Sequence, residues 1–139
     1  MLLTTMAGVM EFVARLETES AAFYREAAAR FPELEAEFSA WAKENVRAEK
    51  QIRQTYYGVI TDTLESNYCF KDLDSDAYRL DLAPPAGAAE AKAKAKAVEE
   101  TIRNFYQTAA ACSEGLMADV PRIFQKTAKK RTERLEDLG

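Results

Sequence analysis

Apolar residues recur every three or four positions along four stretches of the chain, the spacing that gathers them on one face of an α-helix. The first stretch runs from about Thr5 to Phe31, and the second begins at Pro32, whose fixed φ suits the first turn of a helix. The third runs from about Ala88 to the neighbourhood of Gly115, and the fourth opens at Asp119. The pattern therefore predicts an all-α fold.

The connections between these stretches predict how the helices run. Short joins follow the first and third helices, so each pair is expected to form an antiparallel hairpin. The middle connection, from about Asp62 to Gly87, carries clustered Asp residues and the Pro84-Pro85 break, which are signals of irregular chain. At roughly 25 residues it is long enough to travel the length of a bundle and restart the chain in the same direction. The expectation is one domain over residues 1–139, a four-helix bundle of two antiparallel hairpins joined by a long crossover.

Composition narrows the classes of function. The 139 residues are 47% hydrophobic and 30% charged with five Gly and four Pro, which is typical of a folded helical domain. Acidic residues outnumber basic ones by 23 to 19, so no nucleic-acid partner is expected. The chain contains no histidine, which excludes Ser-His-Asp and Cys-His catalysis and every metal site that needs imidazole.

The cysteines and the N-terminal residues indicate the cellular compartment of the protein. Cys69 and Cys112 are too few for a disulfide framework or a zinc site and are expected to be reduced thiols. No basic residue precedes Arg15, and Glu11 interrupts the first apolar run. The sequence therefore predicts a cytoplasmic protein with neither a signal peptide nor a membrane-spanning helix.

An internal repeat relates the two predicted hairpins. A Glu followed by a Phe-Tyr pair in the first helix recurs in the third at a shift of 82 residues. An aromatic residue of the second helix recurs in the fourth at a shift that is four residues larger. The pattern indicates a duplicated helical hairpin. The matched positions are Glu17 and Glu99, Phe23 and Phe105, Tyr24 and Tyr106, and Phe38 and Phe124.

Each predicted helix also places one polar residue inside its apolar stripe. At about 100° per residue, Glu17 points within roughly 40° of Val13 and 20° of Tyr24, so it is expected to face inward. Two buried carboxylates without partners would cost several kcal/mol each, so they must be protonated, metal-bound or paired with cations. Arg131 and Arg134 lie three residues apart on one helical face and can supply these cations. The four polar positions are Glu17, Asn45, Glu99 and Arg131.

These residues resemble the rubrerythrin-like branch of the ferritin superfamily over most of the chain. The resemblance implies a bundle that holds two iron ions with a Glu from each of the first and third helices and a Glu-x-x-His pair from each of the other two. Carried over by position, the single-Glu ligands match Glu17 and Glu99. The Glu-x-x-His positions fall on Asn45 and Ala48 in the second helix and on Arg131 and Arg134 in the fourth.

The chain departs from that family at the ligands that define it. Both Glu-x-x-His pairs are missing, and two guanidinium groups at ligand positions would repel metal ions. Two Glu and two Arg sum to zero charge, so a buried Glu/Arg cluster is expected to fill the vacated chamber, with no metal, cofactor or catalytic residue. Tyr24 and Tyr106 would line this chamber, either packing as core residues or donating hydrogen bonds to the carboxylates.

Two functions are therefore weighed. The first is a non-catalytic binding or structural protein that has lost its di-iron centre and acts as a homodimer, with a protein partner, or with a small ligand in the bundle core. The alternative is a di-metal oxidoreductase that handles peroxide or oxygen with iron or manganese. That alternative needs a rearranged carboxylate set. The candidates are Glu44 and Glu49, which flank Asn45, and Glu133 beside Arg134.

Overall fold

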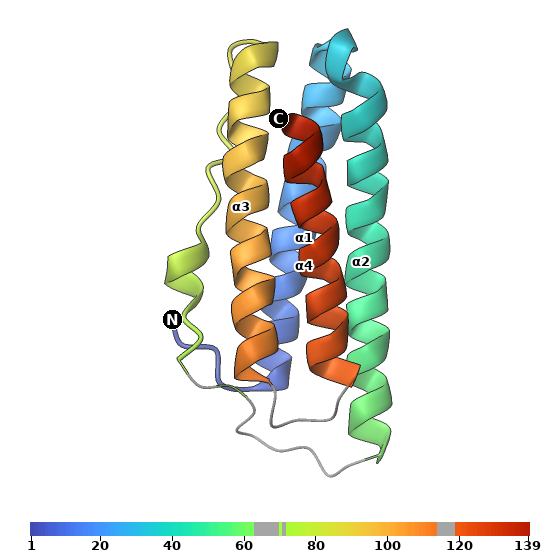
Figure 1. Ribbon diagram of the computed structural model, residues 1–139, viewed down its shortest axis with the longest axis vertical. Helices are drawn as coiled ribbons and strands as arrows, with labels where there is room; N and C mark the ends of the chain where they lie inside the picture. The colour runs from blue at the N-terminus through green and yellow to red at the C-terminus, as the bar shows by residue number, and fades with distance from the viewer. Residues whose placement is uncertain (63–69, 71, 114–118) are drawn as a thin grey trace.

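The computed structural model describes residues 1–62, 70, 72–113 and 119–139, of which 58–62 are described by their backbone only. It confirms the all-α prediction, because four long helices make up most of the described chain (Figure 1). Cys69 and the predicted helix end near Gly115 lie outside these residues. The long helices are α1 (Met6–Arg30), α2 (Glu35–Asp62), α3 (Ala88–Cys112) and α4 (Asp119–Leu138), with short 3-10 turns η1 (Pro32–Leu34) and η2 (Ser75–Tyr78).

Local sequence accounts for where α1 begins and how it turns into α2. The Thr5 hydroxyl accepts a hydrogen bond from the Gly8 amide at 3.0 Å, which satisfies one of the free donors of the first turn. At the other end, Phe31 leaves the helical region with φ −123° and ψ 98°. Pro32 then starts η1, and the Leu34 amide donates to the Phe31 carbonyl at 2.9 Å. This tight turn leads directly into α2.

The helices associate as two hairpins. α1 packs most extensively on α2, and α3 on α4. In Figure 1, α1 and α4 run upward while α2 and α3 run downward. The segment after η2 passes along the outside of α3 to reach its start (Figure 1).

Among the described residues, no helix is both long enough and apolar enough to cross a membrane.

Backbone hydrogen bonds attach part of the crossover to the start of the chain. The Leu3 amide donates to the Leu73 carbonyl at 2.7 Å, and the Ser75 amide donates to the Met1 carbonyl at 2.9 Å. Phe70 and Leu73 are buried, and the Tyr78 ring lies 5.3 Å from the ring of Phe105 on α3. The described part of the connection is therefore packed against the helices and the start of the chain.

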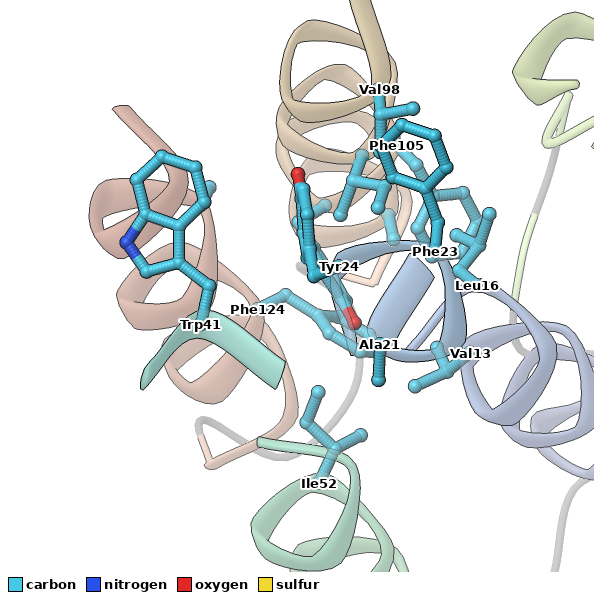
Figure 2. Close-up of a cluster of buried hydrophobic side chains, with 14 of the residues drawn as sticks. Val13, Leu16, Ala21, Phe23, Tyr24, Trp41, Ile52, Val98, Phe105 and Phe124 are labelled. Atoms are coloured by element: carbon cyan, nitrogen blue, oxygen red, sulfur yellow. The ribbon is translucent and has the colours of Figure 1, made fainter. Parts of the chain in front are cut away.

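Aromatic and aliphatic side chains from all four long helices fill the interior. Figure 2 shows residues of this kind from α1, α2, α3 and α4 in one cluster. Tyr24 packs on Phe38 and Trp41, with ring centroids 5.0 and 5.5 Å apart. Buried positions of α1 recur on α3 at the shift of the sequence repeat, so the two hairpins present equivalent faces to the core. The equivalent buried pairs include Val13 and Ala95, Leu16 and Val98, Phe23 and Phe105, and Ala27 and Ala109.

Candidate functional site

The Arg131 guanidinium lies at the centre of the bundle, between the carboxylates of Glu17 and Glu99. Its Nη1 donates to Glu99 Oε2 at 2.6 Å, and its Nη2 donates to both oxygens of Glu17, with 2.6 Å to Oε2. All three residues are at most 1% exposed. Charge-assisted hydrogen bonds of this length are the strong class, so α4 is joined to α1 and α3 through one side chain.

Two tyrosines complete the carboxylate shells in a crosswise manner. Tyr24 of α1 donates to Glu99 Oε2 on α3 at 2.5 Å, and Tyr106 of α3 donates to Glu17 Oε1 on α1 at 3.1 Å. Each repeat thus supplies the hydroxyl that bonds to the carboxylate of the other repeat. Both tyrosines therefore donate hydrogen bonds to the carboxylates in addition to packing in the core.

Asn45 connects the guanidinium to the α1 backbone. Its Oδ1 accepts from Arg131 Nη2 at 2.9 Å, and its Nδ2 donates to the Ser20 hydroxyl at 2.9 Å. Ser20 in turn donates to the Leu16 carbonyl at 2.6 Å. Because an amide offers one acceptor and two donors, Asn45 can serve the guanidinium and the hydroxyl at the same time. The chain of bonds fixes the height of α2 relative to α1.

Arg134 is held less tightly than Arg131. Its Nη1 lies 3.5 Å from both oxygens of Glu99, and its Nη2 lies 3.3 Å from the Trp41 carbonyl and 3.5 Å from Glu44 Oε1. Its Cζ sits 5.3 Å from the centre of the Trp41 ring, a cation–π contact. The Nε atom is buried and has no hydrogen-bond partner among the described residues. These distances are at the long limit for hydrogen bonds.

The residues just described form one unit, named here the central cluster. Two carboxylates and two guanidinium groups give it a net charge of zero, which satisfies the requirement that buried charges be paired. The central cluster consists of Glu17, Ser20, Tyr24, Asn45, Glu99, Tyr106, Arg131 and Arg134.

Burial dominates the electrostatics of the cluster. It raises the pKa of the Glu17 carboxyl, and the guanidinium groups of Arg131 and Arg134 only partly offset that shift. Burial by itself lowers the pKa of Arg131, but Glu17 and Glu99 raise it above its usual value. Burial also raises the pKa of Tyr24 and Tyr106 well above the usual 10.0, and the nearby carboxylates add to the shift. The tyrosines are therefore hydrogen-bond donors at neutral pH.

The structure brings together seven of the eight positions singled out from the sequence. The exception is Ala48, which is only half-buried and lines a cavity beside Arg131 and Arg134. Its methyl group carries no polar atom, so it takes no part in the hydrogen bonds of the cluster. The seven positions are Glu17, Tyr24, Asn45, Glu99, Tyr106, Arg131 and Arg134.

The residues present do not fit the di-iron centre that the family resemblance implies. A metal ion shared by Glu17 and Glu99 would have to take the place of the Arg131 guanidinium, which bonds to both. None of the alternative carboxylates joins these two: Glu44 faces Arg134, Glu49 lies 3.6 Å from the exposed Arg53, and Glu133 is exposed. Among the described residues, no group of three or more His, Cys, Asp or Glu side chains is placed to hold a metal ion.

Sequence reasoning missed three contributors to this site. Ser20 anchors Asn45, and neither this role nor the contacts of Glu44 and the Trp41 carbonyl with Arg134 follow from the sequence analysis. A buried Ser one helical turn after the inward Glu17 is a signal for a polar partner. Contacts to a backbone carbonyl carry no side-chain signal at all.

Searches of protein-family models, of curated proteins and of solved structures find no match to this chain.

Proposed function

We propose that the chain is a rubrerythrin-like, ferritin-like four-helix protein that has lost its di-metal centre and acts as a non-catalytic binding or structural protein. One observation carries the proposal: the Arg131 guanidinium bridges Glu17 and Glu99, the two positions that match the single-Glu ligands of that family. An internal cation then takes over the charge compensation that metal ions would supply.

The equivalence of the two hairpins supports this ancestry. Burial recurs position by position between α1 and α3, and the Tyr-Glu bonds run both ways between the repeats. Asn45 and Arg131, which occupy the equivalent ligand positions of α2 and α4, bond to each other at 2.9 Å. A duplicated hairpin that once enclosed ions on a pseudo-twofold axis accounts for all three features.

The chemistry of the cluster favours binding or structure over catalysis. Glu17 and Glu99 are fully buried, and both accept hydrogen bonds from a guanidinium and a hydroxyl. A general acid or base must exchange protons with a substrate, and neither carboxylate has access to one here. The expected partner is a second copy of the chain, another protein or a small ligand, and light scattering on the purified protein tests the first.

Metal analysis tests the proposal directly. Protein purified from cells supplemented with iron and manganese should carry far less than one metal ion per chain. A near-stoichiometric content of about two ions per chain, as in di-iron bundles, would overturn the proposal and favour the peroxide- or oxygen-handling oxidoreductase.

A restored variant separates the ancestry from the loss of metal. It places Glu-x-x-His pairs back on α2 and α4 and should bind divalent metal tightly. The binding is measured by absorption spectroscopy with cobalt as the metal. A folded restored variant that binds no metal would contradict the ferritin-like ancestry while leaving the metal-free state of the natural chain unaffected. The changes are Asn45→Glu, Ala48→His, Arg131→Glu and Arg134→His.

A further inference from the structure

A basic cavity opens between α2 and α4, directly outside the central cluster. Its volume is about 270 Å³, smaller than the pockets of drug-sized ligands. Arg47 of α2 and Lys126 and Lys130 of α4 line it, and Arg131 and Arg134 form its inner side. Ala48 contributes a methyl group to its lining.

Three of the cations that line this cavity are not neutralised by any residue that the structure describes. Arg47, Lys126 and Lys130 form no ion pair with any described residue. Glu44 is the one carboxylate among the lining residues, and it lies 3.5 Å from Arg134. Converging cations without counter-charges raise the local concentration of anions and hold them by charge-assisted hydrogen bonds.

Arg134 is a second, independent sign of a ligand. It is 5% exposed, yet its contacts to protein lie at 3.3 to 3.5 Å and its Nε has no partner in the described part of the chain. A buried guanidinium normally forms shorter bonds, as Arg131 does. A small movement toward the cavity would let Arg134 bond to an anion there.

We propose that this cavity binds the phosphate group of a small anionic molecule, with Lys126, Lys130 and Arg47 pairing with its oxygens and Arg134 forming the base. Phosphate fits better than a single carboxylate because it carries up to two charges and three acceptor oxygens when esterified. The inference deepens the proposed binding role and rests on it, but it does not depend on ferritin-like ancestry.

The single tryptophan of the chain provides a built-in reporter. Because the Arg134 guanidinium lies over the Trp41 ring, an anion that draws it away changes the fluorescence of Trp41. Inorganic phosphate and glycerol 3-phosphate are titrated at constant ionic strength, with fluorescence and calorimetry as readouts. Succinate and vesicles containing phosphatidic acid are titrated in parallel. We expect saturable binding of both soluble phosphates, with succinate weaker and no preference for the vesicles.

Matched double variants locate the site. Lys126→Gln with Lys130→Gln should weaken phosphate binding by roughly tenfold or more, equivalent to about 1.4 kcal/mol. The control, Lys50→Gln with Lys129→Gln, removes the same total charge from positions outside the cavity, one on α2 and one on α4, and should change affinity less than about twofold. All four lysines are exposed, so both variants should fold. If the first variant nevertheless fails to fold, Arg47→Gln tests the same expectation.

Several outcomes would overturn the inference. These are no saturable binding of phosphate by the natural chain, equal weakening in both double variants, succinate bound as tightly as phosphate, or binding to vesicles alone. The metal content that tests the proposed function is measured on ligand-free protein, so failure of one proposal can be told apart from failure of the other.

Discussion

Replacing Arg131 with Leu is the most direct perturbation of the central cluster. The leucine fills part of the space but removes the guanidinium that bonds to Glu17, Glu99 and Asn45. Only Arg134 would remain to compensate two buried carboxylates, and it lies 3.5 Å from Glu99. The cluster would change from neutral to one uncompensated negative charge.

The size of the effect follows from the burial of these groups. Removing one partner of a desolvated ion pair costs about 3 to 5 kcal/mol, because a charge is left buried without compensation. A domain of this size typically unfolds with a free energy of about 5 to 15 kcal/mol, so the variant should be marginally stable. With the usual unfolding entropy per residue, the midpoint of thermal unfolding should fall by roughly 10 to 17 °C.

The assay is denaturant unfolding followed by far-ultraviolet circular dichroism, with the free energy extrapolated to water. Arg122→Leu is the matched control on the same helix, since Arg122 is exposed and, within the described part of the chain, forms an ion pair only with the exposed Asp119 at 3.8 Å. The control should lose less than about 0.5 kcal/mol. A loss as small as this in Arg131→Leu would refute the role assigned to the guanidinium.

A double variant distinguishes the cost of leaving a charge buried without a partner from the cost of lost packing. Glu17→Leu together with Arg131→Leu leaves Glu99 with Arg134, so the cluster is neutral again. We expect the double variant to be more stable than Arg131→Leu alone, with a coupling energy of about 1 to 3 kcal/mol. Strictly additive losses would show that the two side chains contribute independently, against the bonding seen here.

Three further predictions concern the tyrosines, Asn45 and the start of α3. Because burial raises the pKa of Tyr24 and Tyr106, the stability held by their neutral forms should persist below pH 10.0 and be lost as pH rises through the raised values. Replacing both with Phe should flatten this loss in unfolding experiments at alkaline pH, and unchanged pH dependence would contradict it. Asn45→Ala should cost about 2 kcal/mol by denaturant unfolding, against less than about 0.5 kcal/mol for the exposed Asn104→Ala. Gly87→Asp should raise stability by roughly 0.5 kcal/mol in thermal unfolding, since the N-cap of α3 has extended φ −156° and open space around it, and a decrease would be inconsistent.

The sequence predicts which site residues face inward, because the regular rotation of a helix sets the direction of each side chain about the helix axis. The position of Glu17 between Val13 and Tyr24 on the helical projection places it inward, and the structure buries it. The same reasoning placed Asn45, Glu99 and Arg131 correctly. Ala48 rested on the family resemblance and not on this projection, and the structure places it half-buried in the lining of the cavity between α2 and α4.

The sequence by itself determined which segments are helical, which face of each helix is buried and that the buried charges can balance. Apolar spacing, Pro32 at a helix start and the repeated Glu and Phe-Tyr positions carry all of this, since they depend only on local geometry. Tertiary structure alone decided that Tyr24 bonds to Glu99 and Tyr106 to Glu17, and that a basic cavity remains between α2 and α4. Periodicity gives a side chain its angle about one helix axis, whereas contacts between helices depend on their relative heights and separations, which the packing of the whole core sets.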